Sequence, residues 1–257
     1  MLRKILSVPR LILQRMRSDD FKPRMRLLRG FGKIVFPEYR FKTPYLDWWN
    51  DEWFNRYLKR FDEMNRMNFD RRWNLFQLLK LTYAVEGDTA ECGVYKGSSS
   101  YLIASCNNQA AVTGKVHHAF DSFQGLSSPG EKDGGHWSPG ALRSAFEEAQ
   151  TNLDGLDVNI YTGWIPDKFP EVADKTFSFV HIDVDLYEPA KDSLEFFYPR
   201  MAEGGIILMD DYGLGTCPGV TTAGQEFFSD KPEKLVSLSA GAGYMIKGKS
   251  TAEFIFN

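Results

Sequence analysis

The stretch Phe179-Val180-His181-Ile182-Asp183-Val184-Asp185 decides the fold of this chain, together with Gly205-Ile206-Ile207-Leu208-Met209-Asp210-Asp211. Each stretch is an apolar run that ends in a pair of aspartates. Because the runs lack polar alternation, they predict strands buried on both faces, as in a parallel sheet. Adjacent parallel strands bring their carboxyl ends to one edge, where the ligand crevice of an open α/β sheet lies. The sequence therefore predicts four carboxylates at one crevice.

Such a group of carboxylates predicts a nearby positive charge. Carboxylates that lie close together repel one another unless a cation lies between them. A hard divalent cation is the simplest candidate, because such ions take oxygen ligands.

Strands and helices alternate from Thr89 onward. The predicted strands are 89–94, 116–120, 158–161, 177–182, 205–209, 234–238 and 242–247, and the predicted helices are 98–106, 141–152, 189–198 and 219–228. Repeated βα units predict an α/β fold with a mostly parallel sheet, helices on both faces and right-handed crossovers.

Length and composition fit one such domain with an N-terminal addition. The chain has 257 residues, 43% of them hydrophobic. We expect a basic, helical extension and cap over residues 1–85 and the main domain over 86–257. No apolar run is long enough to predict a membrane span, and no signal peptide is expected. The three cysteines lack metal-site spacing, which favours a reducing cytoplasm.

Charge is unevenly distributed along the chain. Residues 1–42 hold 12 Lys and Arg against 3 Asp and Glu, whereas the remainder holds 19 against 31. Apolar residues interleave with the basic ones, so residues 1–40 could lie on a membrane surface. The other interpretation is a solvated extension that docks on its own domain or on a second subunit.

The segment Glu91-Cys92-Gly93-Val94-Tyr95-Lys96-Gly97 joins the first strand to the first helix. Its glycines allow the backbone to approach a ligand closely, and the free N–H groups of the helix start suit a carboxylate or phosphate. The chain lacks G-x-G-x-x-G and the nucleotide phosphate loop at this place, which argues against nicotinamide and ATP. Once nicotinamide nucleotides and ATP are set aside, a ligand that carries an amino-acid carboxylate is the remaining candidate for this loop.

Three further positions invite either a functional or a structural interpretation. Asp121 ends the second strand, where an acid suits ribose hydroxyls or caps a turn. Trp164 could lie against a nucleobase or pack in the core. His136 lies in the Gly-, Ser- and Pro-rich loop 125–139, where a lid could close over an acceptor, or where it is an exposed loop histidine. His181 is expected to be buried.

Six ordered blocks together resemble the macrocin O-methyltransferase family. They span roughly residues 86–230 and are Glu91-Cys92-Gly93-Val94-Tyr95-Lys96-Gly97, Asp121-Ser122-Phe123-Gln124-Gly125-Leu126, Thr162-Gly163-Trp164-Ile165-Pro166, Asp183-Val184-Asp185-Leu186-Tyr187-Glu188-Pro189, Tyr198-Pro199-Arg200, and Gly204-Gly205 with Asp210-Asp211-Tyr212-Gly213. The resemblance implies a Rossmann-like class I fold and a magnesium-dependent transfer of a methyl group from S-adenosylmethionine to a sugar hydroxyl.

The resemblance also implies roles for individual residues. The cofactor would be bound by Glu91, Gly93, Tyr95, Ser99, Asp121, Ser122, Gly163, Trp164 and Asp183. Magnesium would be bound by Asp183, Asp210 and Asp211. Asp185 would be the general base, with His136 as a second catalytic candidate.

Alternative functions remain open at this point. The acceptor is expected to be a glycan, a nucleotide sugar, a glycosylated natural product or a lipid-linked saccharide, and nucleic acid is not an expected partner. A catechol or phenol O-methyltransferase is one alternative, and a catalytically silent scaffold in a glycan pathway is another. The resemblance further implies a homo-oligomer, formed in part through the N-terminal region.

Overall fold

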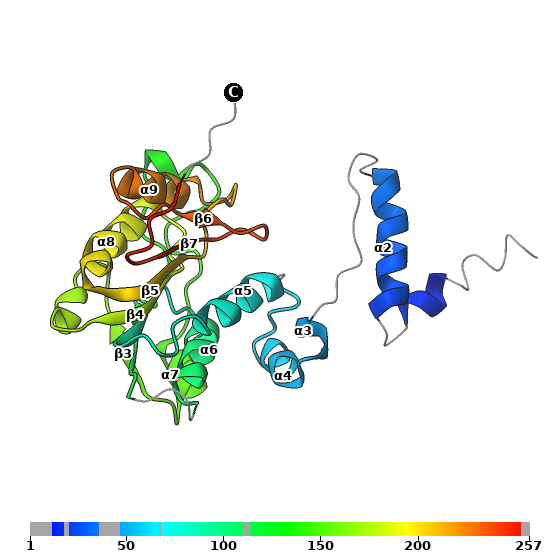
Figure 1. Cartoon of the computed structure of the whole chain (residues 1–257), viewed down its shortest axis with the longest axis horizontal. Coiled ribbons are helices and arrows are strands. Elements are labelled where there is room, and N and C mark those ends of the chain that lie inside the picture. Colours follow the sequence, from blue (N-terminus) through cyan, green and yellow to red (C-terminus); the bar gives the residue numbers. More distant parts are fainter. Residues whose placement is uncertain (1–11, 18–20, 36–46, 67, 110–113, 253–257) are drawn as a thin grey trace, which may run out of the picture. The chain divides into compact units, whose positions relative to one another are not determined.

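The computed structural model describes residues 12–17, 21–35, 47–66, 68–109 and 114–252. The chain forms two compact units, Met1–Arg60 and Phe61–Asn257. The first holds α2 (Phe21–Val35), α3 (Asp47–Asn50) and α4 (Glu52–Arg60). The second holds α5 (Phe69–Leu79) and every strand of the sheet (Figure 1). The predicted boundary at residues 85 and 86 stays a prediction, and α5 belongs to the same unit as the sheet.

A seven-stranded sheet forms the centre of the second unit. Its strand order is β3-β2-β1-β4-β5-β7-β6. The strands are β1 (Asp88–Cys92), β2 (His117–Asp121), β3 (Val158–Thr162), β4 (Phe177–Ile182), β5 (Met201–Met209), β6 (Val236–Ser237) and β7 (Gly243–Ile246). The first five are parallel, and β7 runs antiparallel to β5. The predicted α/β class with a mostly parallel sheet is confirmed.

The strand order changes direction between β1 and β4. From β1 the chain moves outward through β2 to β3, then returns to place β4 on the other side of β1. A crevice forms at such a switch point, outside the carboxyl ends of the two strands. The glycine-containing loop follows β1 and the first aspartate pair follows β4, so the topology brings both to this place.

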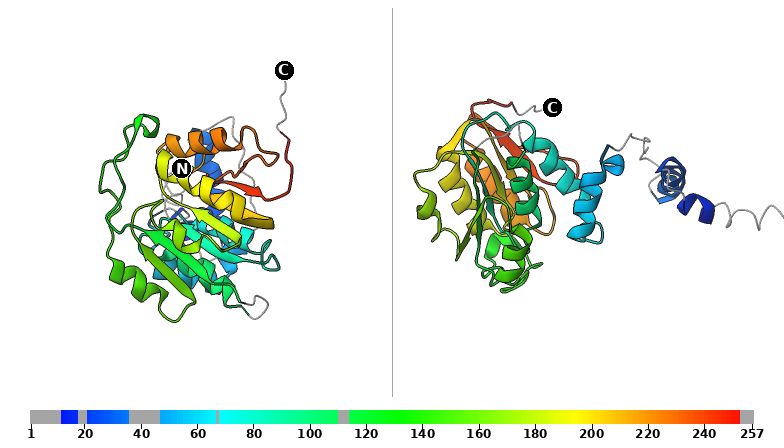
Figure 2. Two further views of the ribbon diagram at one scale, coloured as in Figure 1. Left: turned by 90° about the vertical axis from the view of Figure 1, so that its left-hand side faces the viewer. Right: turned by 90° about the horizontal axis from the view of Figure 1, so that it is seen from below.

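Helices cover both faces of the sheet (Figure 2). On one face lie α6 (Ser98–Asn107) and α7 (Phe146–Leu153), and on the other lie α8 (Tyr187–Phe197) and α9 (Pro218–Phe228). The larger core joins apolar residues of α8 and α9 to β1, β4 and β5, with Phe177, Ile182 and Phe197 fully buried. A smaller core lies between β2 and α7, around Ala119 and Ala149. Three short 3-10 helices, Glu131–Asp133, Phe169–Val172 and Tyr198–Arg200, lie in the connections.

One predicted helix starts later than its sequence pattern indicates. The pattern predicts a helix from 141, but α7 begins at Phe146. The backbone of Ala141 instead accepts a hydrogen bond from Leu126 N at 2.8 Å, and the Ser144 hydroxyl donates to the Tyr95 carbonyl at 2.8 Å. These contacts with residues distant in sequence hold 141–145 outside the helix.

Among the described helices, none has both the length and the apolar character needed to cross a bilayer.

Candidate active site

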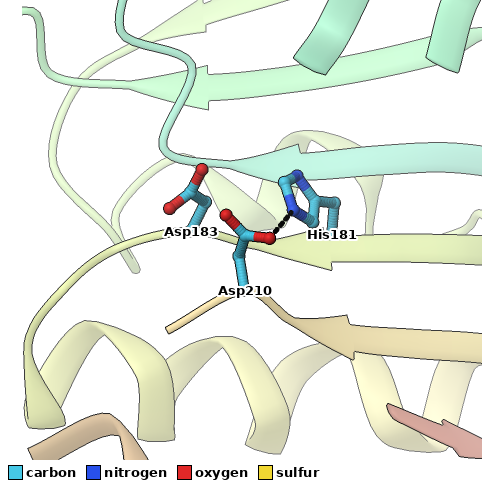
Figure 3. A group of neighbouring side chains, drawn as sticks. All are labelled: His181, Asp183 and Asp210. Atoms are coloured by element: carbon cyan, nitrogen blue, oxygen red, sulfur yellow. Dashed lines mark ion pairs between the residues drawn. The ribbon is translucent and has the colours of Figure 1, made fainter. Parts of the chain in front are cut away.

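The two aspartate pairs meet at the carboxyl edge of β4 and β5. The register pairs Ile182 with Met209, the residues immediately before Asp183 and Asp210. Asp210 N donates to the Ile182 carbonyl at 2.8 Å, and Asp185 N donates to Asp211 Oδ2 at 3.0 Å. Figure 3 shows Asp183 and Asp210 beside one another at the ends of the two strands. The four predicted carboxylates therefore share one buried site.

Two arginines of α5 supply positive charge to this site. Arg71 Nη2 forms ion pairs with Asp210, with Asp211 Oδ1 at 3.0 Å and with Asp183 Oδ1 at 3.7 Å. Arg72 contacts Asp210 Oδ2 at 3.2 Å and Asp183 Oδ2 at 3.4 Å. Sequence analysis missed both arginines. Two adjacent arginines in a largely apolar helix could have indicated a functional role. Only the packing of α5 against the sheet shows which carboxylates the two arginines contact.

Burial and mutual repulsion raise the proton affinity of three aspartates. Burial, followed by the charge of Asp183, raises the pKa of Asp185 to about 7. The same two causes, with the charge of Asp185 added, raise the pKa of Asp211 well above its usual range. Burial and the charge of Asp210 raise the pKa of Asp183. Because their pKa values are raised, these three aspartates take up protons more readily, and this lowers the negative charge of the group.

Asp210 behaves in the opposite way. Burial alone would raise its pKa, but the charges of Arg71 and Arg72 outweigh burial and hold the pKa well below its usual range. Asp210 is completely buried and is the carboxylate that both arginines contact. It is therefore ionised at neutral pH.

His181 lies beneath the site and joins it to β1. Its Nε2 is 3.4 Å from Asp210 Oδ1 (Figure 3). Its Nδ1 is 2.7 Å from Glu91 Oε1. Burial would lower the pKa of His181, but its two carboxylate partners outweigh burial and raise it to about 10. His181 is fully buried, as expected, and it is an imidazolium at neutral pH.

The glycine-containing loop lies against the aspartate site. Gly93 has φ of +90°, and a Cβ atom there would come 1.8 Å from the carbonyl oxygen of Asp183. Only glycine permits this approach. Ser99 is almost fully buried at the start of α6, and Tyr95 adopts a left-handed backbone with φ of 51°. The loop after β1 and the end of β4 thus form one wall.

Glu91 and Asp121 hold the two ends of this loop. The Glu91 carboxylate accepts a short hydrogen bond from the Ser100 hydroxyl and is completely buried beneath the loop. Asp121 accepts hydrogen bonds from the backbone N–H groups of Val94 at 2.8 Å, Tyr95 at 2.7 Å and Phe123 at 2.6 Å. Two carboxylate oxygens offer about four acceptor positions, so Asp121 retains capacity for another donor.

The predicted nucleobase region lies next to Asp121. Gly163 N donates to the Asp121 carbonyl at 3.0 Å, and Trp164 is partly exposed beside it. Ser122 is nearly buried, and its hydroxyl donates to the Gly125 carbonyl at 3.3 Å. The structure thus brings Asp121, Ser122, Gly163 and Trp164 together at the ends of β2 and β3.

Comparison with known proteins matches this arrangement to a family. The model of the macrocin O-methyltransferase (TylF) family matches residues 71–234. The chain belongs to the macrocin O-methyltransferase family. The matched region begins at Arg71, so both the arginines and the four aspartates lie inside it.

Two curated relatives are O-methyltransferases by their names, and the name of the first includes a rhamnosyl group. The 8-demethyl-8-(2,3-dimethoxy-alpha-L-rhamnosyl)-tetracenomycin-C 4'-O-methyltransferase of Streptomyces olivaceus is 30% identical over 149 residues, which is 53% of this chain and 57% of that protein. Demethyldecarbamoylnovobiocin O-methyltransferase of Streptomyces niveus is 29% identical over 174 residues, which is 62% of this chain and 66% of that protein. The chain therefore spans less than two thirds of the length of these relatives.

Solved structures confirm the class I methyltransferase fold. The O-methyltransferase NovP is 26% identical and superposes with a TM-score of 0.62, over 70% of this chain and 81% of NovP. The calicheamicin methyltransferase CalS11 is 17% identical with the same TM-score, over 90% of this chain and 95% of CalS11. The second likeness concerns the fold alone.

In this member of the macrocin O-methyltransferase family, loop 125–139 is anchored at several points. Asp133 is buried and accepts hydrogen bonds from Gly130 N and from Tyr187 N, both at 2.7 Å. The Trp137 indole donates to Cys217 Sγ at 3.4 Å, and that sulfur lies 3.6 Å from Asp185 Oδ1. His136 is exposed, with its ring against Trp137. The residue of this loop that reaches toward Asp185 is therefore Trp137.

Proposed function

We propose that this protein transfers the methyl group of S-adenosylmethionine to a hydroxyl of a sugar. The observation that supports this most is the convergence of four aspartates beside the loop after β1, in a chain of the macrocin O-methyltransferase family. The relatives' names support a glycosylated small molecule as the acceptor.

Asp185 is the proposed general base. A sugar hydroxyl is a weak acid and a weak nucleophile, so removal of its proton as the new bond forms accelerates the transfer. Burial and Asp183 raise the pKa of Asp185 to about 7, which makes it a stronger base than an ordinary aspartate. Its backbone φ of 61° is uncommon for a non-glycine residue and is held by the bond from its N–H to Asp211.

S-adenosylmethionine would occupy the switch point between β1 and β4. The N–H groups at the start of α6 suit its carboxylate, and Gly93 leaves room for its methionine part. Asp121 would accept a ribose hydroxyl with its remaining acceptor capacity, and Gly163 and Trp164 would border the adenine. When bound, the cofactor supplies an electrophilic methyl group on a sulfonium. The chain's own contribution is to align the acceptor oxygen with that methyl group.

The donor set of the aspartate site fits a magnesium ion. All proposed ligands are carboxylate oxygens, which hard divalent cations prefer. Among the described residues, potential ligand atoms within 4.8 Å of one another occur in two neighbouring groups, one of His181, Asp183 and Asp210 and one of Asp185, Asp211 and Cys217. We propose Asp183, Asp210 and Asp211 as the ligands. The ion would stabilise negative charge that develops on the acceptor oxygen.

Arg71 would have to leave before such an ion binds. Its guanidinium pairs with the same three carboxylates, so the two cations would compete for the same oxygens. Arg71 then becomes available to bind an anionic part of the acceptor, such as the phosphates of a nucleotide sugar. Arg72 also pairs with Glu63 at 3.6 Å, a carboxylate outside the proposed ligand set.

The first experiment is titration calorimetry of S-adenosylmethionine and S-adenosylhomocysteine into metal-stripped protein, repeated with magnesium. Binding of both, followed by methylation of nucleotide-linked and glycosidic deoxysugars, is the expected result. A catechol panel in the same assay tests the phenolic alternative. Absence of cofactor binding under either condition would overturn the proposal and favour a scaffold without catalysis.

A further inference from the structure

The N-terminal helix α2 carries four of its five basic residues along one side. Over its 15 residues it has five Lys or Arg and no Asp or Glu. Lys22, Arg26, Arg29 and Lys33 follow one another at spacings of four, three and four. At 3.6 residues per turn, these spacings place all four on one face of the helix.

Large apolar side chains lie along the other side of α2. Leu28, Phe31, Ile34 and Val35 are 51%, 55%, 76% and 65% exposed. They also follow helical spacing, on the face opposite the basic one. The fifth basic residue, Arg24, lies on this apolar side, one turn before Leu28.

A cluster of four exposed, large apolar residues on one helix calls for a partner surface. A second copy of α2 would bring five more positive charges beside the first five, so it would not meet the basic side of the helix with opposite charge.

We propose that α2 lies in the surface of a membrane that contains anionic lipids. An apolar face inserted at the headgroup boundary, flanked by basic residues that contact anionic headgroups, is the arrangement that such helices adopt. The charge of the surrounding sequence agrees with this, since residues 1–42 hold 12 Lys and Arg against 3 Asp and Glu. The helix would hold the protein on the bilayer without crossing it. This proposal stands on α2 alone and is independent of the proposed catalytic activity.

The test is sedimentation of the full-length chain with lipid vesicles. One set contains phosphatidylcholine alone, and the other contains equal parts of phosphatidylcholine and phosphatidylglycerol. We expect binding to the mixed vesicles, weak binding to the neutral ones, and release from the mixed vesicles as salt is raised.

Two double variants separate the contributions of the two faces. R26Q/R29Q should bind the mixed vesicles about 30-fold more weakly, because two basic side chains no longer contact the anionic surface. F31S/I34S should bind at least about 100-fold more weakly, because two large apolar side chains no longer leave water. K175Q/K249Q removes two exposed charges from the second unit and should bind as the parent does. Circular dichroism checks that each variant keeps its helix content.

Several results would overturn the proposal. These are absence of binding to mixed vesicles, equal binding to both kinds of vesicle, and undiminished binding of F31S/I34S. Light scattering provides a further check. If the parent is an oligomer that F31S/I34S converts to a monomer, and vesicle binding is absent, a second copy covers the apolar face instead.

Discussion

Arg71 Nη2 forms ion pairs with three carboxylates, those of Asp183, Asp210 and Asp211. At the scale of single residues, the two arginines supply positive charge to the buried acids, and the raised pKa values of Asp183, Asp185 and Asp211 reduce the negative charge that remains. Asp210 carries its charge because both arginines contact it, whereas Asp185 and Asp211 have raised pKa values. One group of four aspartates thus contains both an ionised anchor and a candidate base.

Replacing Arg71 tests its role as the counter-charge of the site. R71Q should lower the free energy of unfolding by about 3 kcal/mol in metal-free buffer, because it leaves buried carboxylates with one arginine fewer. It should also bind magnesium more tightly, because the competing cation is gone. Chemical denaturation and calorimetry with magnesium alone measure the two effects.

The matched control for this change is R56Q. Arg56 is largely exposed and pairs only loosely with Glu52 at 3.8 Å, so its removal should change stability by no more than about 0.5 kcal/mol. Equal magnesium affinity in R71Q and the parent would contradict the competition between the two cations.

Asp185 is tested by its isosteric amide. D185N should lower kcat by at least about 100-fold, the usual loss when a general base is removed, while the affinity for S-adenosylhomocysteine changes little. In the parent, kcat should rise with pH through about 7, as the carboxyl loses its proton, and then level. A bound cation would move this inflection to lower pH.

The control is D174N, at an exposed position, which should behave as the parent. A D185N protein that keeps its activity would remove Asp185 from the mechanism.

At the scale of elements, the loop after β1 depends on one close backbone contact. Gly93 combines a φ of +90° with direct approach to the Asp183 carbonyl, so the loop and β4 fit together only without a Cβ. The hydrogen bonds from Val94 and Tyr95 to Asp121 then hold the loop from its other side. Three strand ends, those of β1, β2 and β4, therefore determine the shape of one binding wall.

An alanine at position 93 should disrupt this wall. G93A should lower the free energy of unfolding by about 3 kcal/mol or more, from steric overlap added to an unfavourable φ, and should abolish cofactor binding. G135A is the control, since Gly135 is exposed, has no atom within 4 Å of an added Cβ and has no positive φ. Thermal unfolding and calorimetry compare the two, and a G93A protein as stable as G135A would show that the contact is dispensable.

At the scale of the whole molecule, a buried chain of polar groups crosses the sheet to the active site. It runs from Asn107 through Thr89, His117, Ser100 and Glu91 to His181 and Asp210, across α6, β2, β1, β4 and β5. Buried polar groups of this kind stabilise one arrangement of the surrounding elements when all of them have partners. Glu91 is the link between the loop wall and the aspartate site.

Removal of the Glu91 charge tests this link. In E91Q the pKa of His181, about 10 in the parent, should fall, because one of its two carboxylate partners is lost. The free energy of unfolding should fall by about 3 kcal/mol near neutral pH. Proton NMR of the four histidines follows the titration directly. E171Q, at an exposed glutamate, is the control.

The ion pair between Glu91 and His181 also makes the stability of the protein depend on pH. Because the pKa of His181 is raised on folding from about 6.5 to about 10, its contribution is fully present below about 6.5 and is lost as pH rises through about 10. The parent should therefore lose more stability than E91Q over this interval. Parallel unfolding curves for the two proteins would contradict a charged His181.

The sequence by itself determined the class of the fold and most of the candidate site. Apolar runs that end in Asp183 and Asp210 predicted neighbouring parallel strands with their acids at one edge, because strand polarity and burial are local properties of the pattern. The loop after β1 and Asp121 followed from their places at strand ends. The magnesium ion, the cofactor and the roles of these residues stay predictions.

Only the tertiary structure identified the partners of these groups. Arg71 and Asp210 are 139 residues apart, and Glu91 and His181 are 90 residues apart. No local pattern predicts such pairs, because they depend on how α5 packs against the sheet and on which strands become neighbours. The sequence predicted that a positive charge must lie among the aspartates, and the fold showed that the chain supplies one from its own α5.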